Sequence, residues 1–152
     1  MLGVIICIPA PTTGMEAKDN SVASSPIPIG SMGLTAAEPR YTCHRNTSMG
    51  INIVTPYQGQ GYGTEAVLWG LEFAFKHANL HRVKIGALGW NEGALRLYQK
   101  LGFVVEGTDR EAYWYDGGYR DCVWMGMLDR EWAERYGGRV AGKDEVVAGA
   151  EK

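Results

Sequence analysis

The sequence has few cysteines, no long apolar run and no excess of basic residues. Its three cysteines, Cys7, Cys43 and Cys122, stand far apart, with none of the spacings of a zinc site or a disulfide framework. We therefore expect no metal centre and a reducing, cytoplasmic setting. The formal charge of −2 provides no basic surface for the phosphates of a nucleic acid. A nucleic-acid partner is therefore not expected.

The apolar run at the start of the chain, from Leu2 to Ile8, is far shorter than the roughly 20 residues that cross a bilayer. It also lacks a basic flank, which a secretory signal would have. We interpret this run as a buried strand, with the apolar core of a signal peptide as the alternative. No membrane partner is expected.

The length and composition predict one globular domain. The chain has 152 residues, of which 45% are hydrophobic and 21% charged, and a domain of this size buries enough surface to fold without staples. We place the domain at residues 1–136. Within it, residues 9–28 hold four prolines among serines and threonines and predict a long surface loop. Residues 137–152 are small, polar and rich in glycine, and predict a flexible tail.

Apolar spacing along the chain predicts an α/β (α+β) fold. Helical spacing occurs over residues 64–78 and 91–101. Residues 116–118 predict the turn of a β-hairpin. A helix between the strands 49–54 and 82–88 predicts a right-handed parallel crossover within a mixed, mostly antiparallel sheet flanked by helices. The predicted strands are 27–34, 49–54, 81–88, 103–106, 111–115 and 119–128.

Residues 58–64 read Q-G-Q-G-Y-G-T and come directly before the first predicted helix. The first N–H groups of a helix lack partners within it, so glycines there leave a backbone surface that can hold phosphate. A flexible turn is the alternative. A P-loop would need Lys and then Ser or Thr after Gly63, and a dinucleotide fingerprint would need its third glycine one position later. Neither of these two nucleotide motifs fits.

A second motif follows about thirty residues later, N-E-G-A-L-R-L-Y-Q-K-L-G-F at residues 91–103. Together the two stretches resemble the GCN5-related N-acetyltransferase superfamily, which combines Q/R-x-x-G-x-G/A with N-x-x-A-x-x-x-Y-x-x-x-G-F. The resemblance covers about residues 27–132. Residues 106–128 look most like the branch that holds spermidine acetyltransferases and ribosomal-protein N-terminal acetyltransferases, which implies only that the acceptor is an amine.

The resemblance implies a site for acetyl-CoA between the strands 49–54 and 82–88, which would splay apart. The backbone N–H groups of residues 60–64 would hold the pyrophosphate, and Ile53 and Val54 would offer main-chain groups to the pantetheine arm. Asn91 would cap its helix and also face the coenzyme. The implied cofactor-binding residues are Ile53, Val54, Gln58, Gly59, Gln60, Gly61, Tyr62, Gly63, Thr64, Asn91, Ala94 and Tyr98.

Tyr98 is the residue to which the resemblance assigns chemistry. A phenol within hydrogen-bond reach can stabilise or protonate the thiolate that leaves when an amine attacks the thioester. The alternative is an aromatic ring packed in the core. Candidates for the base that deprotonates the amine are Glu106, Asp109 and Glu111, with an exposed position at a strand end as the alternative. The aromatic residues that would line an acceptor pocket, or only form core and dimer contacts, are Tyr113, Trp114, Tyr115 and Trp124.

The chain departs from the family pattern in two places. Family members usually begin with a strand and two helices that form one wall of the acceptor site, and this sequence starts at the second strand. A partner subunit or the 9–28 loop would then supply the wall, or the chain is a truncated form. The connection Pro56-Tyr57-Gln58 is also one residue shorter than is usual in this branch.

These observations favour an N-acetyltransferase that transfers acetyl from acetyl-CoA directly to a primary amine, such as a polyamine, a small amine or a protein N-terminus. A homodimer is a further expectation. The alternatives are a non-catalytic acyl-CoA-binding or dimerisation module, and an unrelated α/β protein with a glycine turn.

Overall fold

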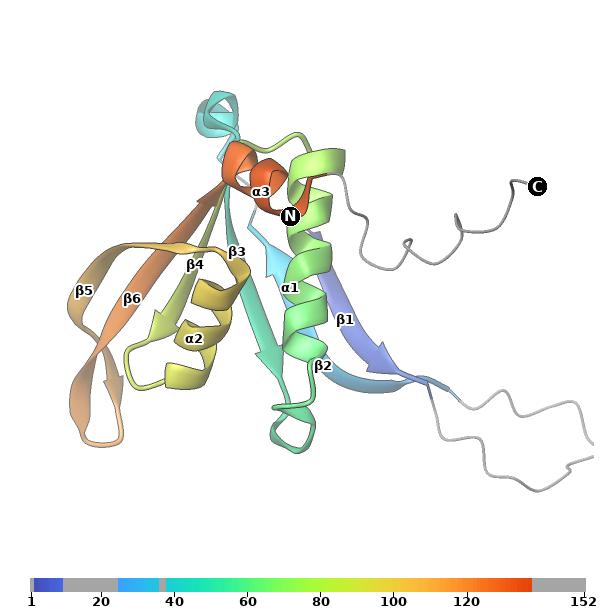
Figure 1. Cartoon of the computed structure of the whole chain (residues 1–152). Helices are drawn as coiled ribbons and strands as arrows, with labels where there is room; N and C mark the ends of the chain where they lie inside the picture. The colour runs from blue at the N-terminus through green and yellow to red at the C-terminus, as the bar shows by residue number, and fades with distance from the viewer. Residues whose placement is uncertain (1, 10–24, 36–37, 138–152) are drawn as a thin grey trace, which may run out of the picture.

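Six strands form one sheet in the computed structural model, which describes residues 2–9, 25–35 and 38–137 (Figure 1). The strands are β1 (Leu2–Ile8), β2 (Ile27–Leu34), β3 (Asn46–Ile53), β4 (Arg82–Leu88), β5 (Val104–Tyr115) and β6 (Gly118–Leu128). The helices are α1 (Tyr62–Glu72), α2 (Glu92–Leu101) and α3 (Asp129–Tyr136), with short helical segments at Pro39–His44, Thr55–Tyr57 and Phe73–His77. No helix in these described ranges is long and apolar enough to cross a membrane.

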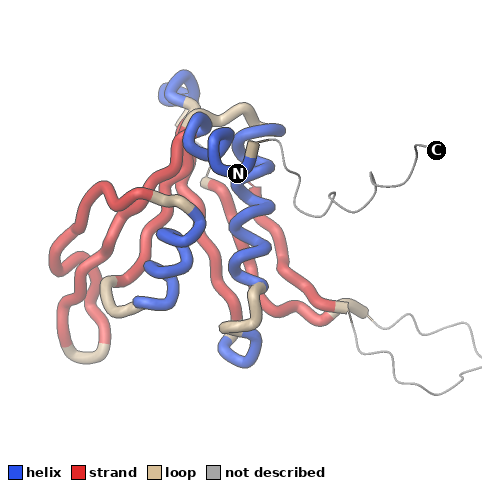
Figure 2. The backbone as a smooth tube through the Cα atoms, in the orientation of Figure 1, coloured by secondary structure: helices blue, strands red, loops and turns tan. Residues whose placement is uncertain are grey.

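The strand order is β1-β2-β3-β4-β6-β5, and every neighbouring pair except one is antiparallel. The exception is β3 and β4, which run parallel and pair only from Asn46 with Arg82 to Met49 with Ile85. Beyond Met49 the two strands separate, so their carboxyl ends form an open fork (Figure 2). The predicted mixed, mostly antiparallel sheet with one splayed parallel pair is confirmed.

The core lies between one face of this sheet and the three helices. Side chains of one parity on the central strands, such as Met32, Met49, Ile85 and Met125, are at most 4% exposed and cluster with residues of all three helices. The cluster takes Val67 and Leu71 from α1 and Ala74 from the segment Phe73–His77 that continues it, all within the predicted helix 64–78. Both α1 and α2 rest on the same face (Figure 1). Each follows the carboxyl end of one of the two separating strands, so the first turns of both helices lie at the fork.

Several boundaries differ from those predicted. β3 begins at Asn46 and not at residue 49. The first helix begins at Tyr62, and its last part, Phe73–His77, widens into a π-helical segment in which Phe75 packs against Trp132 of α3. The hairpin turn lies at Asp116 and Gly117, both with positive φ, as a tight two-residue turn requires.

β1 is a strand, as predicted, but it is not buried. It forms one edge of the sheet and its side chains alternate between half-buried and exposed, with Ile5 72% exposed. Its apolar composition does not distinguish a central strand from an edge strand, which is decided by the strand order. Most of the predicted 9–28 loop and nearly all of the predicted tail, residues 10–24 and 138–152, lie outside the described residues.

Candidate active site

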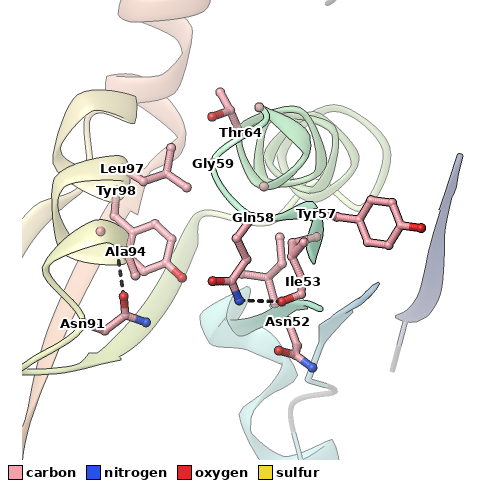
Figure 3. Close-up of a pocket in the computed structure, with 14 residues that line it drawn as sticks. Asn52, Ile53, Tyr57, Gln58, Gly59, Thr64, Asn91, Ala94, Leu97 and Tyr98 are labelled. Atoms are coloured by element: carbon pink, nitrogen blue, oxygen red, sulfur yellow. Dashed lines mark hydrogen bonds between the residues drawn. The ribbon is translucent and has the colours of Figure 1, made fainter. Parts of the chain in front are cut away.

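A cleft of about 550 Å³ opens at the fork between β3 and β4 (Figure 3). Its walls are the end of β3, the loop that leads into α1, and the first turns of α1 and α2. The lining residues are Ile51, Asn52, Ile53, Tyr57, Gln58, Gly59, Gly61, Gly63, Thr64, Asn91, Gly93, Ala94, Leu97 and Tyr98. None of them is a lysine, arginine, histidine, aspartate or glutamate, so any charge bound here must be met by dipoles.

The glycine turn supplies such dipoles. Among the described residues, the backbone N–H groups from Gly59 to Thr64 find no hydrogen-bond acceptor, whereas Gln58 donates to the carbonyl of Thr55 and Glu65 to that of Gly61. Six consecutive free N–H groups at a helix N-terminus, where the helix dipole adds partial positive charge, can bind an anion. We call the N–H groups of residues 59–64 the anion seat.

The backbone conformation of this turn favours glycine, and the space in front of it is open. Gly59 and Gly61 have φ values of 73° and 93°, a region that disfavours residues with a Cβ. A Cβ at either position would meet no atom within 4 Å, so the space in front of the turn is open. The residues therefore fit a phosphate group that approaches the backbone closely.

The ladder of β3 shows which of its main-chain groups face the fork. Val54 donates its N–H to Ile29 on β2 and Ser48 accepts from Thr35, and main-chain groups alternate sides along a strand. The groups of Ile51 and Ile53 therefore point away from β2, into the fork. The carbonyl of Ile53 accepts a 2.7 Å hydrogen bond from Nε2 of Gln58, which leaves the groups of Ile51 and the N–H of Ile53 for an extended ligand.

Val54 does not lie where the sequence places it. Its N–H is bound to Ile29, its carbonyl accepts from the N–H of Tyr57, and it is absent from the cleft wall. Gln60 and Tyr62 do not line the cleft with their side chains either, although their N–H groups belong to the seat. Ile51 was missed, and strand alternation is the signal that identifies it once Ile53 is placed.

Asn91 and Tyr98 reach the cleft from α2. The Oδ1 atom of Asn91 accepts the N–H of Ala94 at 3.1 Å and so caps the helix, while its side chain also lines the cleft. Asn52, Tyr57, Gly93 and Leu97 complete the wall and were not predicted. The α2 residues Gly93 and Leu97 flank Ala94, within a turn of it, so the motif position Ala94 indicates them.

The Tyr98 ring is buried and its hydroxyl is not. The residue is 5% exposed and its ring lies 5.9 Å from that of Phe103. Its hydroxyl makes no hydrogen bond to a described residue. Among the described residues, no side-chain N or O atom is both shielded from solvent and without a hydrogen-bond partner, so this hydroxyl must be accessible. It therefore opens to the cleft, as Figure 3 shows. Burial raises the pKa of Tyr98, which keeps the phenol protonated as a hydrogen-bond donor.

The carboxylates proposed as bases lie outside this cleft. Glu106 forms an ion pair with Arg82, and Asp109 accepts the indole N–H of Trp124 at 2.6 Å. Glu111 donates its backbone N–H to Asp121. Since each lies away from the cleft wall, none is placed beside Tyr98.

The aromatic candidates for the acceptor pocket also lie away from the cleft wall. Lys84 rests on the ring of Trp124, 3.9 Å from its centre, and Tyr113, Trp114 and Tyr115 are exposed on the hairpin of β5 and β6. The three histidines, His44, His77 and His81, do not line the cleft. Within the described ranges, no group of three or more His, Cys, Asp or Glu residues is placed to hold a metal ion.

Comparisons with known proteins find related acetyltransferases. The spermidine N(1)-acetyltransferase of Escherichia coli K12 is 32% identical over 89 residues, which is 59% of this chain and 48% of that protein. A putative ribosomal N-acetyltransferase of Bacillus subtilis is also 32% identical over 89 residues, 59% of this chain and 49% of that protein. The chain thus spans about half the length of the curated relatives it matches.

Solved structures show the same fold. A dodecameric spermidine N-acetyltransferase from Vibrio cholerae superimposes with a TM-score of 0.66 at 29% identity, covering 71% of this chain and 61% of that one. The family model described as an acetyltransferase (GNAT) domain matches residues 12–104, more than half of the chain. The chain therefore belongs to the GNAT acetyltransferase domain family.

Proposed function

We propose that this protein is an acetyl-CoA-dependent N-acetyltransferase that acts on a primary amine. The observation that carries the proposal is the position of the Tyr98 hydroxyl in the same cleft as the six free N–H groups of residues 59–64. Family membership supports it.

The cleft offers one place for each part of acetyl-CoA. The N–H groups of residues 59–64 would hold the diphosphate, and the main-chain groups of Ile51 and Ile53 would pair with the amide-bearing pantetheine arm as an added strand would. Leu97 and Ala94 would contact the arm from α2. The coenzyme supplies an acetyl group activated as a thioester.

In the proposed reaction the amine nitrogen attacks the thioester carbonyl, so that a C–N bond forms and the C–S bond breaks. Full proton transfer from a phenol with pKa about 10 to a thiolate whose conjugate thiol has pKa about 8.5 is uphill by about 2 kcal/mol. Burial of Tyr98 raises its pKa and increases this difference. Tyr98 therefore acts mainly by donating a hydrogen bond to the departing sulfur.

The amine must lose a proton before it attacks. For an alkylamine with pKa about 10.4 this costs about 4.6 kcal/mol at pH 7. Because the described cleft wall holds no carboxylate or imidazole, we propose that the proton leaves through water.

The acceptor is proposed only as a class. The names of the relatives refer to spermidine and to ribosomal acetylation, and polyamines, small amines and protein N-termini all present a primary amine. The formal charge of −2 favours such a cation over a nucleic acid. We also propose a cytoplasmic location, in keeping with three widely spaced cysteines.

Calorimetry with acetyl-CoA tests the seat. Gly61→Glu places a carboxylate beside the bound phosphate and should lower affinity at least tenfold; Gly63→Glu does the same at a position without a positive φ. Gly107→Glu on β5, where a Cβ also meets no atom, is the charge-matched control. Unchanged affinity in both cleft variants would overturn the seat.

A turnover assay over a panel of amines tests the chemistry. Acetylation of any primary amine, reduced in Tyr98→Phe, supports the proposal. Acetyl-CoA binding without acetylation of any amine would favour the alternative, a non-catalytic acyl-CoA-binding module, for which the lack of a base in the cleft is the supporting observation.

A further inference from the structure

Lys84 lies on the face of the sheet opposite to the helices, next to the fork. Along β4, Val83 and Ile85 point into the core, and Lys84 between them points to the other face. β4 is one arm of the fork, and the last pair that joins it to β3 is Met49 with Ile85. Lys84 therefore stands one residue before the point where the two strands separate.

The indole of Trp124 holds the Lys84 amine at this point. The Nζ atom of Lys84 lies 3.9 Å from the centre of the Trp124 ring, a favourable distance for a cation above an aromatic face. The ring in turn lies on Gly86, because a Cβ at Gly86 would stand 2.7 Å from its Cζ3 atom. Gly86 is the first residue of β4 beyond the last pair with β3, so the ring places the amine at the fork.

The ring is fixed, and the amine on it is not part of an ion pair. Asp109 accepts the indole N–H at 2.6 Å, which sets the orientation of the ring. The carboxylate of Glu106, also on β5, pairs with Arg82. Lys84 forms no salt bridge with a described residue. Its contact with the ring is therefore the interaction that positions the amine, and no carboxylate has to be displaced before the amine moves.

The position across the fork from this amine is open. By continuation of the register between β3 and β4, Gly50 stands opposite Gly86, and a Cβ at Gly50 would meet no atom within 4 Å. The cleft borders three consecutive residues of β3, Ile51, Asn52 and Ile53, so it follows the free edge of that strand and not only its core face. The thioester of an acetyl-CoA bound along this edge would lie on the side that faces the amine.

We propose that Lys84 is itself an acetyl acceptor, so that the protein modifies its own side chain when acetyl-CoA is bound and no other amine is present. The proposal rests on the acetyl-CoA site of the proposed function. Nζ of Lys84 gives one proton to water and attacks the thioester carbonyl carbon, so that a C–N bond forms and the C–S bond breaks. The coenzyme leaves as a thiolate beside the Tyr98 hydroxyl and takes up the second proton of the nitrogen through water. The products are acetyl-lysine and free coenzyme A.

Two other lysines provide internal controls for spontaneous acetylation by the thioester. Two groups held together react at an effective concentration far above that of groups that meet by diffusion. The Nζ atom of Lys76 also lies over an indole, 5.4 Å from the centre of the Trp132 ring, but it belongs to the segment after α1, away from the cleft wall. Lys100, in the last turn of α2, is exposed and reports reaction from solution.

Peptide mass spectrometry on the full chain, incubated with deuterium-labelled acetyl-CoA and no amine, tests the proposal. We expect Lys84 to be labelled at least about tenfold faster than Lys76 or Lys100, at a rate per chain that does not change with protein concentration. Tyr98→Phe should slow the labelling of Lys84 and not that of Lys100, because only the reaction in the cleft uses the phenol.

Two variants test the position of the amine. Lys84→Arg keeps a cation over the ring but offers no amine to acetylate, so the label at residue 84 should disappear without appearing on a neighbouring residue. Trp124→Leu removes the ring that holds the amine at the fork, and labelling of Lys84 should fall at least about tenfold while that of Lys100 stays the same. Circular dichroism and calorimetry with acetyl-CoA should show that both variants fold and bind the coenzyme.

Several results would overturn the proposal. Equal labelling of the three lysines, labelling of Lys84 that speeds up with protein concentration, or unchanged or faster labelling of Lys84 in Trp124→Leu would each do so. Acetylation of an added amine with Lys84 left unlabelled would overturn this proposal and leave the proposed function standing. Binding of acetyl-CoA with neither Lys84 nor any added amine acetylated would overturn both.

Discussion

The side-chain amide of Gln58 donates a 2.7 Å hydrogen bond to the main-chain carbonyl of Ile53 (Figure 3). This bond ties the loop that carries the anion seat to the last residue of β3. Both residues line the cleft, so the bond fixes the distance between the place proposed for the diphosphate and the strand proposed for the pantetheine arm. Gln58 is therefore a positioning residue.

Replacing Gln58 should weaken acetyl-CoA binding without unfolding the protein. Gln58→Ala loses one hydrogen bond, which contributes about 0.5–1.5 kcal/mol, and calorimetry should show affinity lower by about two- to tenfold. Gln58→Glu cannot donate to the carbonyl and adds a negative charge beside the seat, so its loss should be larger. In the control Gln60→Ala, the lost bond is to Pro56, outside the cleft wall, and affinity should change little. Equal losses at both positions would contradict the role of Gln58.

The two glycines of the turn should respond differently to alanine. Gly61 has φ of 93°, so Gly61→Ala should lower the free energy of unfolding by about 1–2 kcal/mol. Gly63 has no positive φ, and its added Cβ would meet only Cδ2 of Leu97 at 3.6 Å, an ordinary contact. Gly63→Ala should therefore be neutral or slightly stabilising. Urea denaturation of the two variants checks this, and an equal loss at both positions would refute the conformational argument.

Local signals predicted the parts of the site that depend on neighbours along the chain. The glycine turn, the start of α2 and the cap at Asn91 each follow from residues within one helical turn. The assignment of Val54 to the pantetheine arm comes from the family resemblance. The side to which its N–H points is set by its bond to Ile29 on β2, and a single strand pattern does not contain that information.

The helix α3 was missed for a related reason. Its signals are acidic residues in the first turn, Arg135 in the last, and the aromatic pair Trp132 and Tyr136 four residues apart. An eight-residue helix is marginal by itself. It forms because Trp132 packs on Phe75 and the Tyr136 hydroxyl donates to the carbonyl of Leu101, and both contacts are tertiary.

Asp129, the first residue of α3, bonds to His81, and the stability of the protein at low pH tests this contact. Partial burial of Asp129 opposes ionisation, but hydrogen bonds from His81 and from the N–H of Arg130 outweigh it and lower the pKa of Asp129. Because the pKa of Asp129 is lower in the folded protein than in the unfolded chain, where it is about 4, ionisation of Asp129 stabilises the folded state above about pH 4. This contribution to stability is lost as the pH falls through the pKa of the folded state. Wild type should therefore exceed Asp129→Asn in stability at pH 6, and the difference should vanish near pH 2. A difference that persists there would exclude ionisation as its cause.

Tyr98→Phe should separate activity from stability. The hydroxyl makes no hydrogen bond to a described residue and opens to the cleft, so removing it should change the free energy of unfolding at pH 7 by less than about 0.5 kcal/mol. Turnover should fall roughly a hundredfold, because the donor to the leaving sulfur is lost.

The same variant tests the protonation of Tyr98. Burial raises the pKa of Tyr98. The stability linked to this group is therefore intact below about pH 10 and is lost as pH rises from there through the pKa of the folded state. Denaturation at pH 7 and pH 11 should show the phenylalanine variant gaining on the wild type at the higher pH. Equal pH dependence in the two proteins would mean that the phenol ionises as freely in the fold as in the unfolded chain, and the case for a protonated donor at the cleft would fail.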